Sequence, residues 1–255
     1  MLAIERRNLI LTALQEDKRV LVADLSQRYD VSEETIRRDL EKLEKEGYVK
    51  KTYGGAVINE DTNVDLPFMI RKKKNVIGKQ RIAELAAELV EDGDRVMLDG
   101  SSTAVFIAKR LKTKHNLTVI TNSIEILIEL SDVSGWKIMS TGGTMKEGSL
   151  ALEGHQTERM LGSYHVDKAF VSCKGVDAKN GITDLSESYA AAKKLMLDAA
   201  DKRILAVDST KFDCVSFTRI VNFDGITTIL TDKEPSAAWK QFFAGAGIEC
   251  VFPRA

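Results

Sequence analysis

The spacing of apolar residues changes along the chain and divides it into two parts. Up to residue 57 the spacing is helical, with apolar side chains recurring every three or four positions. A first helix is predicted from Ile4, Leu9, Ile10 and Leu14, and a second from Val20, Val22 and Leu25. A third helix follows from Ile36, Leu40 and Leu43, which share one face. The first part of the chain therefore predicts a small three-helix unit.

The third helix has clear ends and a charged outer face. Ser32 is suited to cap its N-terminus and Gly47 to end it. Because the apolar residues face inward, the adjacent Arg37 and Arg38 remain on the surface. Residues 48–57 then have the composition of two short strands around a turn. Together these features predict a winged helix-turn-helix, in which one helix enters the major groove of DNA and the hairpin, or wing, contacts the flanking backbone.

Contact with another protein is the alternative use of such a unit. The paired arginines and the basic wing favour DNA, since a packing unit has no need of them. The candidate DNA-binding residues are Ser32, Thr35, Arg37, Arg38, Lys42, Lys50, Lys51 and Tyr53. A single recognition helix reads little sequence, so we expect a homodimer or homotetramer on double-stranded operator DNA.

Strands and helices alternate in the remainder of the chain. Polar residues and Pro67 predict a linker at 58–75, which leaves a DNA-binding domain at 1–57 and a second domain at 76–255. Strands are expected at 95–98, 117–120, 137–140, 168–172, 204–207, 227–230 and 249–252, and helices at 76–91, 103–112, 123–131, 187–200 and 236–244. This alternation predicts an α/β domain with a mostly parallel sheet.

Polar loops follow several of these strands at the point where each strand ends. In an open parallel sheet those ends share one edge, where ligands bind. Hydroxyls and free amides at a helix start can surround a phosphate, and carboxylates can accept hydrogen bonds from sugar hydroxyls. The candidate effector-binding residues are Asp99, Ser101, Ser102, Thr103, Thr121, Asn122, Gly142, Gly143, Lys174, Gly175, Asp184, Asp208 and Lys211. Coincidental turns are the alternative, and the repetition along one sheet edge favours a sugar-phosphate site.

Charge and cysteine content narrow the possible functions. Residues 1–81 carry 17 basic and 14 acidic side chains, whereas residues 82–255 carry 20 and 24. Specific contacts in an oligomer, and not bulk charge, are therefore expected to supply DNA affinity. Cys173, Cys214 and Cys250 lack metal-ligand spacing, so we expect ordinary thiols and neither a metal nor a cofactor. Without an apolar stretch long enough for a bilayer, the chain is expected to be cytoplasmic.

The run TIRRDLEKLEKEGYVKKTYGGAV closely resembles the N-terminal domain of the DeoR family of bacterial transcriptional regulators. This resemblance implies that the helix containing residues 35–40 enters DNA and that Gly54, Gly55 and Ala56 close the wing. The family usually has a histidine before the two glycines, where this chain has Tyr53. An aromatic ring there can still lie against a sugar or phosphate, with different hydrogen bonding.

The second domain also resembles the family, whose C-terminal domain is similar to ribose-5-phosphate isomerase. The matching motifs are Asp99 to Thr103, Thr121-Asn122, Gly142-Gly143, Lys174-Gly175 and Asp208 to Phe212. One departure concerns Lys193, because relatives often carry a glutamate one turn earlier, where this chain has Tyr189 and a nearby Glu187. Whether Lys193 and Glu187 contact ligand is left open, and we favour a solvated Lys193.

The resemblance implies a transcriptional regulator, most often a repressor of a sugar-metabolism operon that a phosphorylated sugar relieves. An activator with the same effector class is one alternative. A sugar-phosphate isomerase is a second, but residues 171–177, VSCKGVD, lack the acidic Asp-Gly-Ala-Asp-Glu signature of that enzyme. We therefore expect a retained pocket without catalysis.

Overall fold

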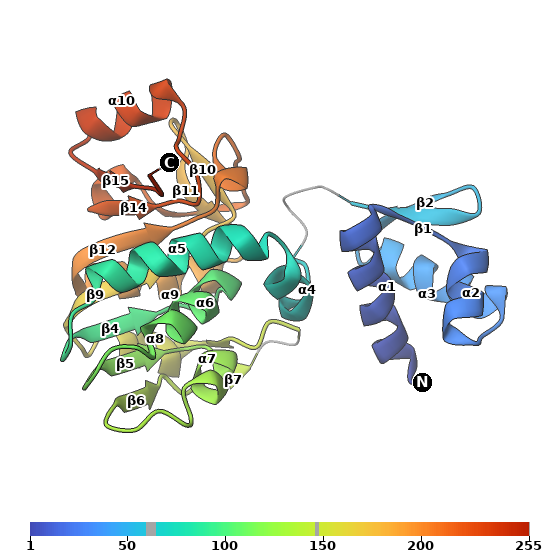
Figure 1. The fold of residues 1–255 in the computed structure, drawn as a ribbon, viewed down its shortest axis with the longest axis horizontal. Coiled ribbons are helices and arrows are strands. Elements are labelled where there is room, and N and C mark those ends of the chain that lie inside the picture. The colour runs from blue at the N-terminus through green and yellow to red at the C-terminus, as the bar shows by residue number, and fades with distance from the viewer. Residues whose placement is uncertain (60–64, 146–147, 255) are drawn as a thin grey trace. The chain divides into compact units, whose positions relative to one another are not determined.

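The computed structural model describes residues 1–59, 65–145 and 148–254, apart from the side chain of Gln15. These residues form two compact units, which divide between Lys74 and Asn75 (Figure 1). Each unit has its own core and is described separately below.

The N-terminal unit contains four helices and a three-stranded antiparallel sheet within its described residues. The helices are α1 (Ala3–Asp17), α2 (Val22–Tyr29), α3 (Glu33–Lys45) and α4 (Phe68–Lys73). The strands are β1 (Arg19–Leu21), β2 (Val49–Thr52) and β3 (Gly55–Ile58), in the order β1-β3-β2. Ile36, Leu40 and Leu43 of α3 are fully buried, as their spacing predicts. The three-helix unit with a hairpin wing is confirmed.

Two sequence expectations for this unit need correction. Ile4 and Leu9 are exposed by 56% and 44%, while Ile10, Leu11 and Leu14 fill the core. Leu9 lies about 200° around the helix axis from Leu11, on the opposite side of α1, and Ile4 lies in the first turn of α1.

Part of the expected linker is folded onto the N-terminal unit. Ile70 belongs to its core, Leu66 packs against that core, and α4 contacts α1. Residues 60–64, the remaining part of that expectation, lie outside the described residues. The unit therefore extends to Lys74, because Phe68 and Ile70 bury their side chains and do not remain in solvent.

The second unit is built on a seven-stranded sheet in the order β15-β14-β12-β9-β4-β5-β6, and every adjacent pair is parallel. Its strands are β4 (Arg95–Leu98), β5 (Thr118–Thr121), β6 (Lys137–Ser140), β9 (Val166–Val171), β12 (Ala200–Ala206), β14 (Thr228–Leu230) and β15 (Glu249–Val251). The expected α/β fold with a mostly parallel sheet is confirmed.

Helices cover the sheet on both faces. They are α5 (Val76–Leu89), α6 (Ser102–Leu111), α7 (Ile124–Glu129), α8 (His155–Leu161), α9 (Glu187–Asp198) and α10 (Ala237–Gly245). Helix α5 packs along α6 in front of the sheet in Figure 1, and α9 packs on β9 and β12 behind it. Met97, Ala169 and Leu205 project into one core with residues of α9 and α10. Short 3₁₀ turns occupy Ser209–Lys211 and Phe223–Gly225.

Two small antiparallel sheets were not expected. One contains β10 (Gly175–Asp177), β11 (Gly181–Asp184) and β13 (Thr218–Val221), and the other contains β7 (Thr144–Met145) and β8 (Leu152–Glu153). Their strands are too short to show a clear alternation of apolar and polar residues, and helix α8 is only seven residues long. The first of these sheets supplies Asp184.

The order of the strands marks one position for a ligand. The chain runs outward from β4 through β5 to β6 and then returns to β9, on the other side of β4. In open parallel sheets such a reversal of strand order leaves a crevice at the carboxyl ends of the two strands. Met97 of β4 is level with Ala169 of β9, so Asp99 and Ser172 follow adjacent strands at that crevice.

Candidate functional site

The recognition helix α3 presents its arginines to solvent. Ser32 caps the helix, since its Oγ accepts a hydrogen bond from the Thr35 backbone N–H at 3.2 Å. Arg37 and Arg38 are exposed, and each forms an ion pair with an acid one turn earlier on the same helix. Lys42 is exposed near the other end of α3. The predicted cap and the predicted outward face are both confirmed.

A buried ion pair fixes α3 to α1. Asp39 is only 4% exposed, and its Oδ2 lies 2.5 Å from Nε of Arg6, with Arg7 Nη1 3.6 Å from Oδ1. This contact was not among the sequence predictions. The clue in the sequence is Asp39 itself, an acid between Ile36 and Leu40 on the buried face of α3, because a buried carboxylate requires a cationic partner.

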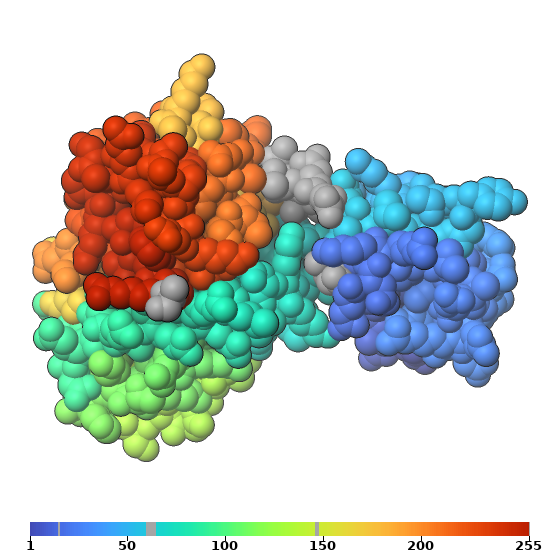
Figure 2. All heavy atoms as spheres, turned by 45° about the horizontal axis from the view of Figure 1, so that its top comes forward, coloured from blue at the N-terminus to red at the C-terminus, as the bar shows by residue number. Residues whose placement is uncertain are grey.

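The wing projects from the unit at the turn between β2 and β3 (Figure 2). Tyr53 at this turn is completely exposed, and Lys50 and Lys51 on β2 are exposed as well. The Lys51 backbone N–H donates to Glu44 Oε1 at 2.8 Å, which holds the wing against α3. Gly55 is required for close packing, because a Cβ there would lie 2.0 Å from the Val20 carbonyl oxygen. All eight candidate DNA-binding residues therefore lie on α3, its cap or the wing.

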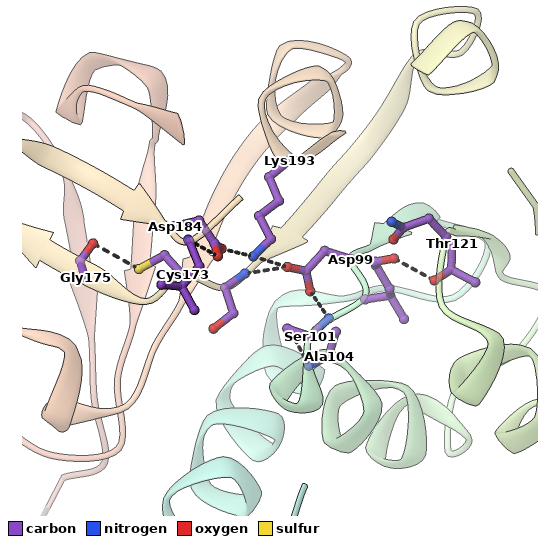
Figure 3. Close-up of polar contacts among 12 residues, drawn as sticks. Asp99, Ser101, Ala104, Thr121, Cys173, Gly175, Asp184 and Lys193 are labelled. Carbon is purple, nitrogen blue, oxygen red and sulfur yellow. Dashed lines mark hydrogen bonds and ion pairs between the residues drawn. The ribbon is translucent and has the colours of Figure 1, made fainter. Parts of the chain in front are cut away.

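At the crevice between β4 and β9, Asp99 is the central side chain (Figure 3). It is 1% exposed, and its carboxylate accepts hydrogen bonds from two backbone N–H groups. Oδ1 accepts from Ser101 at 3.1 Å, and Oδ2 accepts from Ser172 at 3.0 Å. Asp99 therefore joins the loop after β4 to the end of β9, where the strand order reverses.

Lys193 lies between two carboxylates. Its Nζ donates a hydrogen bond to Asp184 and is 3.5 Å from Oδ2 of Asp99 (Figure 3). The three side chains come from α9, β11 and the β4 loop. Burial lowers the pKa of Lys193, but Asp184 and Asp99 outweigh this effect and raise the pKa above its ordinary value. The favoured reading of Lys193 as a solvated residue is thus wrong, because its side chain is only 12% exposed. Glu187, by contrast, is exposed at the start of α9.

Cys173 lies beside this charged group. Its Sγ is 3.4 Å from the Gly175 carbonyl oxygen, and burial raises the pKa of its thiol to about 12. The charges of Lys193, Asp184 and Lys211 all act on this thiol, which places Lys211 near the same group. Among the described cysteines none forms a disulfide.

The hydroxyls and amides predicted at the strand ends have unequal roles. Ser101 Oγ caps α6 by accepting from the Ala104 N–H at 3.1 Å, while Ser102 and Thr103 start the helix. Thr121 Oγ1 donates to the Leu98 carbonyl oxygen at 2.7 Å and links β5 to β4. Asn122 donates to the Leu152 carbonyl oxygen at 3.0 Å, but its buried Oδ1 has no partner among the described residues.

The remaining candidates lie on neighbouring loops. Gly142 and Gly143 have positive φ angles of 64° and 112°, and a Cβ on Gly143 would approach Thr157 Oγ1 to 2.2 Å, so this position requires glycine. The Lys174 backbone N–H donates to the Thr183 carbonyl oxygen at 3.0 Å. Gly175 packs directly against the Cys214 carbonyl oxygen. Lys174 and Gly175 thus lie beside Thr183 of β11, the strand that ends at Asp184.

Asp208 and Lys211 form a pair after β12, with 3.8 Å between Oδ2 and Nζ. Burial raises the pKa of Asp208, but the Lys211 charge and hydrogen bonds from Thr210 outweigh it and hold the pKa below its ordinary value. In the described part of the chain, His, Cys, Asp and Glu side chains do not gather in threes as a metal site would require. The arrangement instead offers carboxylates, amides and ammonium groups for a polar organic ligand.

Both units match models of one protein family. Residues 6–62 match the DeoR-like helix-turn-helix domain, and residues 74–233 match the DeoR C terminal sensor domain. The chain belongs to the DeoR family. This membership agrees with the resemblance found in the sequence, and it makes the protein a DNA-binding transcriptional regulator and not an enzyme.

Relatives of this DeoR-family chain are similar over nearly their whole length. The uncharacterized HTH-type transcriptional regulator YulB of Bacillus subtilis is 43% identical over 91% of this chain and 90% of its own. The HTH-type transcriptional repressor GlcR of Bacillus subtilis is 34% identical, covering 97% and 95%. The L-fucose operon activator of Haemophilus influenzae is also 34% identical, covering 89% and 91%.

Among solved structures, ribose 5-phosphate isomerase A from Methanocaldococcus jannaschii matches with 19% identity and a TM-score of 0.39. The match covers 52% of this DeoR-family chain and 53% of the isomerase. Along the described ranges, no helix combines the length and the apolar composition needed to span a bilayer.

Proposed function

We propose that this protein is a cytoplasmic repressor of a sugar-metabolism operon, which a phosphorylated sugar releases from its operator. The observation that carries this proposal is the buried group of Asp99, Asp184 and Lys193 at the reversal of the strand order, in the unit that matches a sensor domain. Charged groups buried at such a position suit a ligand with many polar atoms.

The chemistry of the crevice suits the two halves of a sugar phosphate. The carboxylates of Asp99 and Asp184 can accept hydrogen bonds from sugar hydroxyls. The start of α6, at Ser102 and Thr103, has backbone N–H groups and the positive end of a helix dipole for a phosphate. Lys211 supplies a further cation, whose side chain is 22% exposed and paired with Asp208. In this arrangement the ion pairs with Lys193 hold both carboxylates in place before the ligand arrives.

At the other unit, we propose that Arg37 and Arg38 read base edges in the major groove and that Lys50, Lys51 and Tyr53 hold the flanking backbone. Ser32 and Thr35 position the start of α3, and Lys42 contacts phosphate near its other end. A homodimer or homotetramer would present several such units to repeated half-sites. The sugar phosphate would favour an arrangement of the oligomer that does not fit the operator, and a few kcal/mol of difference in affinity would suffice.

The test is binding of the purified full-length protein to its own upstream DNA, by fluorescence anisotropy at fixed salt. A panel of sugar phosphates is added, with the matching unphosphorylated sugars as controls. We expect specific binding that one sugar phosphate weakens and its free sugar does not. Lys211→Met should raise the concentration of that effector needed for release, while Lys194→Met, on the exposed side of α9, should not. Specific binding unaffected by the whole panel contradicts the proposed effector class.

Activation is the second candidate, favoured by the name of one relative, an operon activator. It predicts the same operator binding, but with transcription that rises when protein and effector are present together. Transcription from the upstream promoter in a purified system, with and without the effector found above, separates the two signs of regulation.

A further inference from the structure

The exposed arginines of α3 are already neutralised within their own helix. Arg37 Nη2 lies 2.6 Å from Glu33 Oε2, and Arg38 Nε lies 3.1 Å from Glu34 Oε1. All four side chains are well exposed, the least of them by 47%. Neither glutamate is needed to cap the helix, because Ser32 supplies that hydrogen bond. Their charge also suits the positive end of the helix dipole, but that role does not require an arginine partner. Both acids lie on the proposed DNA-facing surface.

Carboxylates on such a surface affect the two kinds of DNA binding differently. Nonspecific binding depends on Lys and Arg neutralising phosphates and releasing their counterions. An arginine that is paired with its own carboxylate neutralises no phosphate, and the carboxylate itself repels the DNA backbone. Specific binding adds hydrogen bonds to base edges, for which arginine is the most common donor. Only the specific site therefore offers a replacement for the glutamate.

The strength of the pairs allows this exchange. Exposed ion pairs between residues four apart on a helix are weak, so base contacts can open them readily. For the same reason they cannot hold an arginine in one orientation for a bidentate contact. The presence of Glu33 and Glu34 is therefore better explained by selection among DNA sequences than by pre-orientation of the arginines.

We propose that Glu33 and Glu34 are specificity-determining residues of the DNA interface. They keep Arg37 and Arg38 paired on nonspecific DNA, and release them where base contacts take the place of the carboxylates. The inference rests on the proposed function, in which α3 enters the major groove.

The experiment compares the wild-type protein with Glu33→Gln, Glu34→Gln and the double variant, all full-length. Glutamine keeps the length and polarity of the side chain and removes its charge. Anisotropy with the upstream operator fragment and with a scrambled duplex is measured over a range of salt concentrations. For the double variant we expect affinity for scrambled DNA to rise about three- to tenfold, with the log–log salt slope steeper by about 1–2. Operator affinity should change less than about twofold, so that discrimination falls.

Glu46→Gln is the matched control. Glu46 is exposed just beyond the other end of α3 and forms no ion pair among the described residues. It lies roughly 18 Å along the helix from Glu34, which exceeds the screening length of about 8 Å at physiological salt. We expect wild-type affinity for both DNAs. A cooperative thermal melt well above the assay temperature, followed by circular dichroism, checks that every variant is folded.

The outcomes separate this inference from the proposed function. An equal rise on both DNAs, or wild-type discrimination in the double variant, overturns the inference and leaves the regulator intact. A fall in operator affinity overturns it in favour of pre-orientation. If the wild-type protein itself does not prefer any upstream fragment to scrambled DNA, the proposed DNA interface and this inference fail together.

Discussion

The proposed DNA-binding surface and the proposed effector crevice both pair basic side chains with carboxylates, but in opposite surroundings. On α3, Arg37 and Arg38 meet glutamates in open solvent, where each pair is easily exchanged. In the crevice, Lys193 meets Asp99 and Asp184 with almost no solvent, so that loss of one partner leaves a buried charge. The difference teaches that exposed pairs can readily exchange one partner for another, whereas the buried group holds its side chains in one fixed arrangement.

The largest effect should come from removing the buried cation. Lys193→Met leaves two carboxylates in one buried group, and we expect the second unit to lose about 3–5 kcal/mol of unfolding free energy near pH 7. The measurement is urea unfolding followed by tryptophan fluorescence, since Trp136 and Trp239 both lie in this unit.

Lys194→Met is the control for this variant, because Lys194 forms an exposed pair with Asp198 on the same helix. We expect it to cost less than about 1 kcal/mol. Equal losses for the two would mean that burial does not distinguish the crevice from the surface.

Asp39 gives the corresponding test within the N-terminal unit. Asp39→Asn leaves Arg6 buried without its counter-ion, and we expect a loss of about 3 kcal/mol in the stability of that unit. Thermal unfolding by far-ultraviolet circular dichroism checks this. Glu34→Gln, which breaks an exposed pair on the same helix, should cost only about 0.3–0.5 kcal/mol.

On the DNA side, the exposed residues should matter for binding and hardly for stability. Arg37→Ala and Arg38→Ala should each weaken operator binding by about 1–3 kcal/mol and relax the sequence preference. Lys50→Ala should weaken operator and scrambled DNA alike, with a salt slope smaller by about 1. A uniform loss for the arginine variants would identify phosphate contacts in place of base contacts. Anisotropy titrations at several salt concentrations distinguish these outcomes.

The smallest effect is expected at the opposite edge of the sheet from the crevice. There Arg95 hydrogen-bonds Asp167 and lowers the pKa of that carboxyl to about 2. Because the pKa of Asp167 is lowered, this carboxylate stabilises the folded protein fully when the pH is above 3.8, its ordinary pKa. The stabilisation disappears as the pH falls through about 2. Asp167→Asn should therefore lose stability at pH 7 and match the wild type at very acidic pH. Because solvent screens this pair, the change should be smaller than the losses expected for Lys193→Met and Asp39→Asn.

The same contrast explains how much could be predicted from sequence. The buried face of α3 and the cap at Ser32 depend on neighbours within one or two turns, so spacing alone revealed them. The polar ends of the strands were also visible locally, and the structure brings two of these predicted residues, Asp99 and Asp184, together around Lys193. Lys193, in contrast, lies in an alanine-rich helix where a lysine usually faces solvent. Its burial depends on partners from β4 and β11, which no local pattern connects.

Arg6 and Asp39 were missed for the same reason, because they are 33 positions apart. Helix α4 was not predicted because residues 71–74 are all basic, a composition that favours a solvated segment. The apolar Phe68 and Ile70 before them are nevertheless buried. Long-range packing thus decided every feature of the site that the sequence did not reveal.

The position of Cys173 gives the crevice a natural chemical reporter. A buried thiol with a pKa of about 12 is almost entirely protonated near neutral pH, so alkylating reagents meet neither an accessible nor a nucleophilic sulfur. Its labelling rate then follows the fraction of time for which the crevice is open, and not the reactivity of the thiol. Cys214, at the half-buried loop beyond Lys211, should label earlier under the same conditions. Mass spectrometry of the peptides that contain Cys173 and Cys214 would thus measure the opening of the crevice in the protein without substitutions.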